Sequence, residues 1–294
     1  MAVESLGTNL DEKDLRSNLL NLEREIKNGD QSESHLGTEY HNPVGDRVRG
    51  WMTDATESSS DNDMDVSEKR SMSFLEIKNI IKSDYEWYLS DSDFNTINKR
   101  LESKADEVLK CWERYKELNE PKPKFLPFLL GNLWYNSCDD KNDYLAVVDF
   151  SMGGEDNRLY LINMKSNKVE INTTCMQWQW KNWVQTFSNK EGTWQSSLGL
   201  AQVPVSEKEW NPRNYHRERG HKDRNLLLRW AEPGFNDNIL KRYIYIHTWE
   251  ASKGCFTLPQ NEIWHEVIDK MAYGGVIESF YPYPKYLKET NILS

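Results

Sequence analysis

One cysteine and one histidine in the C-terminal part of the chain have the residue types for acyl transfer. The stretch HTWEASKGCF, residues 247–256, places His247 eight positions before Cys255. A thiol is only slightly ionised at neutral pH, so a nucleophilic cysteine needs a base within hydrogen-bonding reach. Imidazole suits this task because its pKa lies near neutrality. Cys255 is therefore a candidate nucleophile and His247 its candidate general base.

The residue before the cysteine fits this chemistry. Gly254 lets the backbone approach a substrate closely, or adopt a dihedral that other residues resist. Backbone N–H groups of Gly254 and Cys255 could stabilise the oxyanion of an acyl-transfer intermediate. The spacing alone also fits a second interpretation, in which Cys255 is a buried thiol and His247 a structural imidazole.

Strands are needed to position this pair. In KRYIYIHT, residues 241–248, two isoleucines alternate with Tyr243, Tyr245 and His247, which puts His247 at the exit of a half-buried strand. Alternating apolar residues predict further strands at 144–150, 158–164, 225–230 and 275–281, the first two beginning an antiparallel meander. One helix is predicted among them, at 260–273. We therefore expect a β-rich sandwich in this half.

A helical region is expected before the strands. From residue 72 to 119, apolar side chains recur at three- and four-residue steps. The run PKPKFLP, 121–127, ends this pattern because proline cannot continue a helix. Cys111 lies on the apolar stripe, so we assign it to packing.

The N-terminal segment 1–66 is polar and includes an acidic, serine-rich stretch that is typical of a flexible linker. Leucines at helical spacing within 15–26 indicate a short amphipathic helix before it. The sequence thus predicts an α+β protein in three parts: a polar, partly flexible region at 1–66, a helical region at 67–130 and a β-rich part at 131–294.

Composition excludes several classes of protein. The net charge of −10 over 294 residues offers no basic stripe for a nucleic-acid backbone. No apolar run reaches the ~18 residues of a membrane span, and the first residues lack the pattern of a signal peptide. The four cysteines show no CxxC spacing and are too few for a disulfide scaffold. We expect no nucleic acid partner and no membrane span.

The segment HTWEASKGCFTLP resembles the active-site segment of the L,D-transpeptidase catalytic domain family, in which a strand ends in histidine and a loop leads to Ser-x-Gly-Cys. It is most similar to the murein L,D-transpeptidase subgroup that lacks a second histidine before the glycine. Four more blocks resemble that subgroup in the same order, and together they cover roughly 140–282: DYLAVVDFS, RLYLINMKSNKV, FSNKEGTWQSSLGL and GFNDNILKRYIYIH.

The resemblance implies an L,D-transpeptidase-like catalytic domain at 131–294 that acts on peptidoglycan stem peptides. Cys255 would attack the L,D-bond next to meso-diaminopimelate with His247 as the base, and Ser252 and Gly254 would shape the oxyanion site. The thioacyl enzyme would be resolved by an amine, in cross-linking or exchange, or by water, in carboxypeptidase action. No metal or cofactor is implied.

The chain departs from the family pattern in three places. Thr248 stands where the family usually has glycine, and the loop from His247 to Cys255 is much shorter than is typical. That loop forms one wall of the acceptor side, so its loss makes transpeptidation more doubtful than thioacylation. In place of a histidine-glycine pair the chain has TTCMQWQW, in which we assign Cys175 to packing.

Three residues are our substrate-binding candidates: Arg242, Asn236 and Trp249. For Arg242 and Asn236, hydrogen bonding that braces the site is favoured over direct chemistry. The basic stretch 213–224 could hold substrate carboxylates, although a solvated loop is the simpler interpretation. Its histidines lack the spacing of a zinc helix, so no metal is expected. Four tryptophans could stack on sugars but are more typical of packing: Trp178, Trp180, Trp183 and Trp194.

The place of action follows from the substrate. We expect synthesis in the cytoplasm without a signal peptide, whereas peptidoglycan lies outside the cytosol. The sequence therefore predicts a secreted antibacterial effector, such as a type VI secretion cargo, that acts in the periplasm of a target cell. A secretion-machine component or adaptor and a cognate immunity protein would be its further partners. Two alternatives stay open: a cytoplasmic L,D-carboxypeptidase of muropeptide recycling, and a non-catalytic protein that binds stem peptides or a partner.

Overall fold

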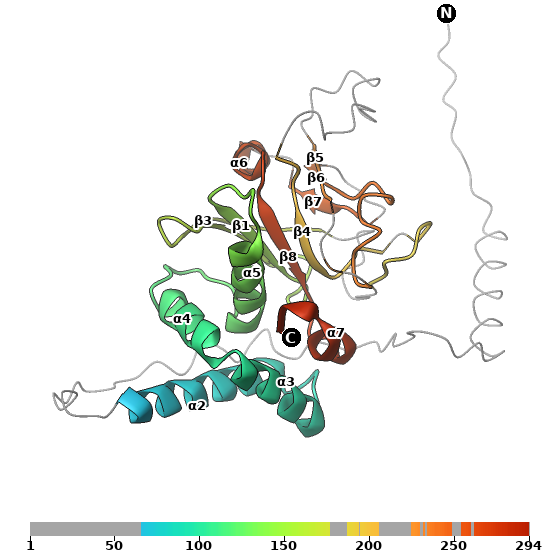
Figure 1. Cartoon of the computed structure of the whole chain (residues 1–294). Coiled ribbons are helices and arrows are strands. Elements are labelled where there is room, and N and C mark those ends of the chain that lie inside the picture. The colour runs from blue at the N-terminus through green and yellow to red at the C-terminus, as the bar shows by residue number, and fades with distance from the viewer. Residues whose placement is uncertain are drawn as a thin grey trace, which may run out of the picture. The chain divides into compact units, whose positions relative to one another are not determined.

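A five-stranded mixed sheet is the central element of the computed structural model (Figure 1). The structure describes residues 66–176, 187–193, 195–205, 225–229, 232, 234–248, 254–259 and 262–293. The strands lie in the order β3-β2-β1-β8-β4 and span Tyr144–Asp149 (β1), Leu159–Asn163 (β2), Lys168–Thr173 (β3), Gly199–Gln202 (β4) and Val276–Phe280 (β8). Strands β1 to β3 form an antiparallel meander, β8 runs parallel to β1, and β4 is antiparallel to β8.

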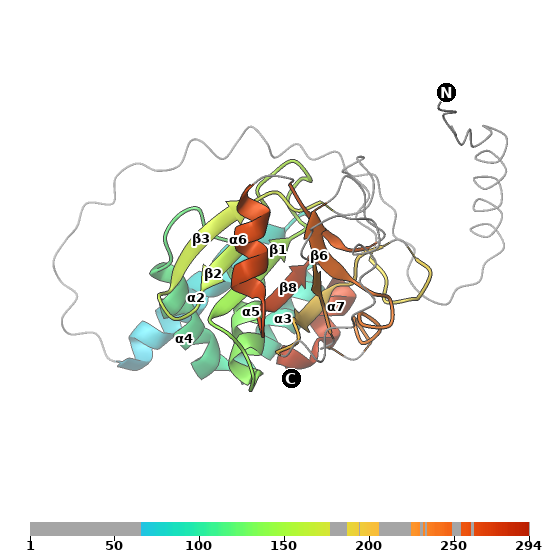
Figure 2. The same cartoon turned by 90° about the horizontal axis from the view of Figure 1, so that it is seen from above.

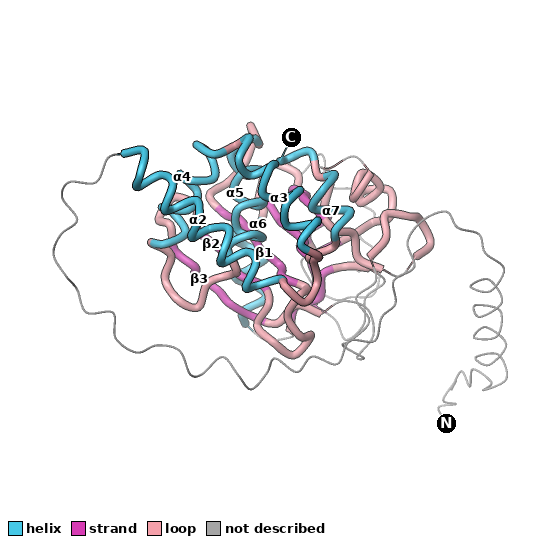
Figure 3. Tube along the Cα trace, turned by 90° about the horizontal axis from the view of Figure 1, so that it is seen from below, coloured by secondary structure: helices cyan, strands magenta, loops and turns pink. Residues whose placement is uncertain are grey.

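Helices cover one face of this sheet. They are α2 (Val66–Tyr85), α3 (Asp91–Ser103), α4 (Ala105–Lys116), α5 (Phe125–Ser137) and α7 (Pro284–Glu289), followed by the 3-10 helix η3 (Asn291–Leu293). Figure 3 shows these helices gathered over the strands when the molecule is seen from below. Leu145 and Val147 of β1 point into the core that the helices share with the sheet, because alternate residues of a strand face opposite sides.

Helix α5 joins the helical layer to the sheet. Ten of its thirteen residues are buried, so it is apolar all round, as expected for a helix without a solvent-facing side. Gly131 permits the close packing, since a Cβ atom there would lie 3.1 Å from a methyl group of Leu145 and 3.2 Å from Cβ of Glu278. The helices before α5 therefore bury their apolar faces in the same core as the sheet.

A smaller sheet and one helix cover the opposite face. Strands β5 (Leu226–Leu227), β6 (Tyr245–Thr248) and β7 (Phe256–Leu258) lie in the order β5-β6-β7, and helix α6 (Glu262–Met271) contacts β1, β3 and β6 (Figure 2). Ala146 and Val148 of β1 point into this second core. Because apolar cores lie on both faces, strands β1, β2 and β8 are buried almost throughout, whereas the edge strand β3 alternates between buried and more exposed residues.

The predicted α+β class is confirmed: helices lie on the N-terminal side and strands dominate the C-terminal part. The strands predicted at 144–150, 158–164 and 275–281 and the helix at 260–273 each contain an observed element. The strand predicted at 241–248 is shorter than expected, because the chain forms a turn up to Tyr243 and β6 begins only at Tyr245.

The helical region also differs from the prediction. The predicted helical region 72–119 is divided among three helices, since α2 ends at Tyr85, α3 spans Asp91–Ser103 and α4 begins at Ala105. Helix α5 was not predicted, because PKPKFLP was interpreted only as an end. Pro127 instead lies in the first turn of α5, where a missing N–H costs no helical hydrogen bond. Helix α2 begins at Val66, inside the predicted linker, and the predicted helix at 15–26 lies outside the described residues.

The division at 66/67 and 130/131 stays a prediction, although α2 to α5 share one core with the central sheet. None of the helices described is long and apolar enough to cross a bilayer.

Candidate active site

Strand pairing brings His247, in β6, close to Cys255, the residue that precedes the neighbouring strand β7. Strands β6 and β7 are parallel, with Ile246 opposite Phe256 and His247 opposite Thr257. Cys255 immediately precedes β7, so continuing this register places it beside Tyr245, two residues before His247 along β6. His247 is buried, with 8% of its surface exposed. One small sheet thus positions both candidate catalytic residues, His247 within β6 and Cys255 directly before β7.

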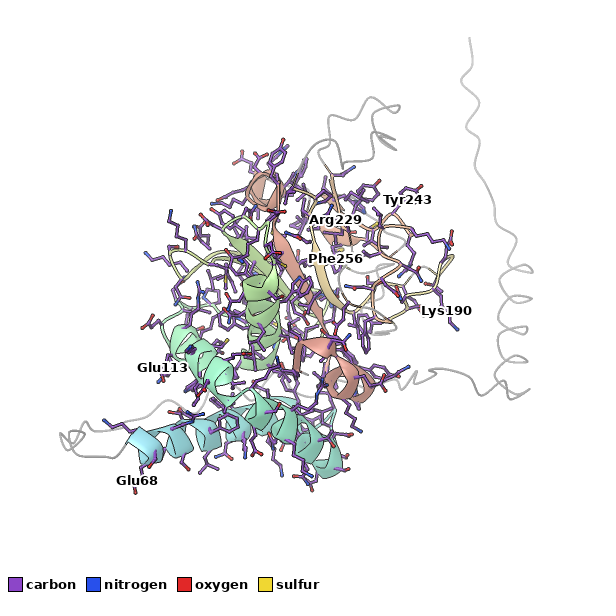
Figure 4. The ribbon with its side chains drawn as sticks, in the orientation of Figure 1. Glu68, Glu113, Lys190, Arg229, Tyr243 and Phe256 are labelled. Carbon is purple, nitrogen blue, oxygen red and sulfur yellow. The ribbon has the colours of Figure 1, made fainter. Side chains whose placement is uncertain are left out.

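Two backbone groups hold the Cys255 thiol. The N–H of Tyr245 donates to Sγ of Cys255 at 3.4 Å, and Sγ donates to the carbonyl oxygen of Tyr243 at 3.7 Å. Tyr243 has a φ of 54°, which is rare for a residue with a side chain and turns its carbonyl towards the thiol. Figure 4 labels Tyr243 at the rim of this region and Phe256 further inside. Backbone groups of the turn before β6 and of β6 itself therefore position the Cys255 thiol.

Burial raises the pKa of the Cys255 thiol to about 11, although the Tyr245 N–H and the charge of Arg242 lower it. The sulfur is thus a thiol at neutral pH, and a base must remove its proton before attack. Cys255 is half-buried, whereas the other three cysteines are buried. Burial also raises the pKa of the Cys175 thiol to about 12. The burial of Cys111 and Cys175 confirms their assignment to packing.

Gly254 has a backbone conformation that excludes other residues. Its φ is 95°, and a Cβ atom there would lie 2.6 Å from the carbonyl oxygen of Gln195. The backbone before Cys255 therefore packs against the segment from Ser188 to Ser197, which we call the 188–197 segment. Glycine is needed here for its dihedral and for the absence of a side chain.

Arg242 holds the same segment. Its Nη1 donates to the carbonyl oxygen of Ser188 and to Oγ of Ser197 at 2.6 Å. Its Nη2 donates to Oγ1 of Thr193 at 3.3 Å and to the carbonyl oxygen of Gln195. These contacts favour a bracing role, and direct contact of Arg242 with substrate stays a prediction.

Asn236 lies in the turn from Phe235 to Tyr243, which we call the 235–243 turn. Its Oδ1 accepts from the N–H of Glu232 at 2.7 Å, and its Nδ2 donates to the carbonyl oxygen of Leu200. Only 1% of Asn236 is exposed. The side chain thus fastens the turn to β4, which again favours bracing, and its predicted contact with substrate is untested.

Several predicted site residues lie outside the described residues. They are Ser252 and Trp249, the four tryptophans Trp178, Trp180, Trp183 and Trp194, and the basic stretch 213–224. Their roles stay predictions. Within the described ranges there is no group of three or more His, Cys, Asp or Glu side chains that could hold a metal ion.

A family model, the L,D-transpeptidase catalytic domain, matches residues 130–280. The chain belongs to this family. The match begins within α5 and ends with β8, so it includes both sheets and the pair His247 and Cys255. No curated protein and no solved structure matches the chain. The family predicted from the ordered sequence blocks is confirmed, and membership supports an enzyme that modifies peptidoglycan.

The L,D-transpeptidase domain contains site residues that sequence reasoning missed. Tyr243 and Tyr245 were interpreted as side chains on one face of a strand, whereas their backbone groups contact the thiol. The 188–197 segment was recognised only as a block resembling the family. The order of the blocks was a signal for its presence, but its contact with Gly254 depends on tertiary packing that periodicity does not encode.

Proposed function

We propose that Cys255 is the nucleophile of a stem-peptide enzyme and that His247 is its general base. The observation that carries this proposal is the half-buried thiol of Cys255, held between Tyr245 N–H and Tyr243 C=O within a domain of the L,D-transpeptidase family. The other three cysteines are buried and have no comparable access. The matched blocks thus coincide with the one thiol that a substrate can approach.

The proposed reaction proceeds in two steps. His247 takes the thiol proton while Sγ of Cys255 attacks the peptide carbonyl carbon, and the C–N bond then breaks as the leaving amine receives that proton. Water or a second amine attacks the thioester, its proton passes to His247, and the carbon–sulfur bond breaks to restore the thiol. Because the pKa of Cys255 is raised to about 11, His247 acts as a base on a neutral thiol, not as the partner of a preformed thiolate.

The acceptor preference follows from the short connection between base and nucleophile. Only seven residues, Thr248 to Gly254, separate His247 from Cys255. An amine on a second stem must be held in place to outcompete water, and a short connection offers little wall to hold it. We therefore propose hydrolysis, or exchange with small free amino acids, over cross-linking.

Incubation with purified tetrapeptide and pentapeptide muropeptides, followed by mass spectrometry, tests this function. We expect shortened stems, and exchanged stems when a D-amino acid is added. A Cys255→Ala sample prepared identically is the matched control. Abundant stem-to-stem dimers would contradict the acceptor preference, while unchanged muropeptides that still bind the protein would favour the non-catalytic alternative.

We also propose that the protein is a secreted antibacterial effector. Its support is the long polar segment 1–66, which contains none of the proposed catalytic residues and has no evident use in a recycling enzyme. The polar composition suits a region that contacts a secretion machine or an adaptor instead of a core.

Expression with and without an added Sec signal peptide tests the effector role. We expect the chain to be harmless in the cytosol and toxic when it is sent to the periplasm, because peptidoglycan lies there. Cys255→Ala should be harmless in both places. Growth curves of the four strains decide the matter, and equal growth of the two wild-type strains would favour the cytoplasmic recycling enzyme.

A further inference from the structure

The hydrogen bonds described for the Arg242 guanidinium all go to a single segment of the chain. All four contacts described above are acceptors within the 188–197 segment: two carbonyl oxygens and two hydroxyl groups. They involve four of the five N–H donors that an arginine carries. Little hydrogen-bonding capacity is left for the carboxylate of a ligand, so the arrangement fits a residue that holds part of the protein.

The segment that Arg242 holds is also the one that contacts Gly254. The carbonyl oxygen of Gln195 accepts from Arg242, and the same atom would lie 2.6 Å from a Cβ atom on Gly254. Arg242 Nη2 itself would lie 3.1 Å from that Cβ atom. The guanidinium, Gln195 and the backbone before Cys255 thus pack directly on one another.

The charge of Arg242 also acts on the thiol. Burial raises the pKa of Cys255, and the charge of Arg242 opposes this rise. Burial likewise lowers the pKa of Arg242, and the charge of the Cys255 thiolate opposes that fall. Other titratable groups lie on the elements that pack around the thiol: Tyr243, Tyr245 and His247 before and within β6, and Lys190, Glu191, Asp237 and Lys241 on the outer loops. Lys241 pairs with Glu191 at 2.9 Å, and both side chains are mostly exposed, so their opposite charges largely offset each other.

We propose that Arg242 is a positioning residue that presses the 188–197 segment onto Gly254 and fixes a positive charge beside Cys255. The proposal rests on the proposed function, in which Cys255 is the nucleophile. The Arg242 side chain thereby fixes the position of the backbone that precedes Cys255, and its charge stabilises the thiolate that forms during attack. A lysine keeps the charge but cannot reproduce the planar fork that reaches several acceptors at once.

Alkylation of Cys255 by iodoacetamide tests the charge without any substrate. In this reaction the thiolate displaces iodide, so below the thiol pKa the rate follows the thiolate fraction. We compare Arg242→Gln, Arg242→Lys and the control Lys241→Met at pH 9, reading the modified Cys255 peptide by mass spectrometry. Loss of the charge should raise the pKa by about one unit, so Arg242→Gln should react about tenfold more slowly. Arg242→Lys should stay within about threefold of wild type, and Lys241→Met should not differ from it.

Hydrogen exchange tests the packing. Amides of the 188–197 segment should exchange at least about tenfold faster in both Arg242 variants than in wild type, because neither variant can hold all four acceptors. If Arg242→Gln does not fold, Arg242→Lys alone decides this arm. Unchanged exchange in a folded Arg242 variant would overturn the positioning role.

Four other outcomes are informative. If Arg242→Gln were alkylated at the wild-type rate, the charge effect would be overturned. Equal slowing of Arg242→Gln and Arg242→Lys would also overturn it, because that result indicates that only packing was lost. Wild-type protein that is inactive on muropeptides, while the Arg242 variants still differ as expected, would reject the proposed function and leave Arg242 as a positioning residue of the thiol. Active wild-type protein with unchanged Arg242 variants would reject the inference and keep the function.

Discussion

Replacing Cys255 by alanine is expected to reduce muropeptide turnover by about 10⁴-fold or more, because the variant cannot form the thioacyl intermediate. The fold should persist, since the thiol is half-buried and the hydrogen bonds described above join it to backbone groups. Product formation followed by mass spectrometry measures the loss, and circular dichroism with thermal unfolding measures the fold.

Cys138→Ser is the matched control for this substitution. Cys138 follows α5 on the other side of the central sheet and is 7% exposed, and burial raises the pKa of its thiol to about 11. Its loss should leave turnover within about twofold of wild type. If Cys255→Ala retained normal turnover, or Cys138→Ser lost it in a folded protein, the nucleophile would be misassigned.

Gly254→Ala is expected to lower turnover by about 10²-fold or more. An alanine at a φ of 95° is strained by about 1–2 kcal/mol, and its Cβ atom would meet the Gln195 carbonyl oxygen at 2.6 Å. That neighbour is backbone held by Arg242 and cannot rotate away, so the chain before Cys255 must shift instead. A displacement of about 1 Å at a reacting atom costs on the order of 10²-fold in rate.

Gly234→Ala is a control that separates the effect of the strained backbone dihedral from the effect of a clash between the added Cβ atom and its neighbours. Gly234 has a φ of 83°, close to that of Gly254, but nothing lies within 4 Å of a Cβ atom built there. Its substitution should cost about 1–2 kcal/mol of stability from strain and leave kcat within about threefold of wild type. Equal kcat for Gly254→Ala and Gly234→Ala would show that contact with the 188–197 segment does not position the nucleophile.

The central sheet could be predicted from sequence because its strands are apolar and sharply bounded. YLAVVD and RLYLIN flank a turn with two glycines, and that local chemistry specifies an antiparallel pair. Helix α5 could not be predicted in the same way, since a helix buried all round has no amphipathic stripe to reveal its period. Its start also coincides with prolines, which were interpreted as an end to helical structure.

The sequence was sufficient to propose which residues form the candidate site, but it did not predict the contacts between them. His247, Gly254 and Cys255 were identified from residue types and spacing, together with the resemblance to the family. The strand KRYIYIHT was predicted four residues too long, because alternation continues through Tyr243 while the backbone there is left-handed. Neither the contact of Gly254 with Gln195 nor the contacts of Arg242 follow from periodicity, since both join segments about fifty residues apart.

Helix α5 also decides where the chain can be divided. The family match starts at residue 130, in the middle of α5, but a chain cut there would lose Phe125, Phe128 and the other residues of its first turns. The side chains of Leu145 and Val147 would then face water in place of the helices they now pack against. The start of the family match therefore differs from the start of the part of the chain that forms one core with the sheet. Helices α2 to α4 are structural partners of the enzyme domain, so a truncated chain that keeps this core must begin before Val66.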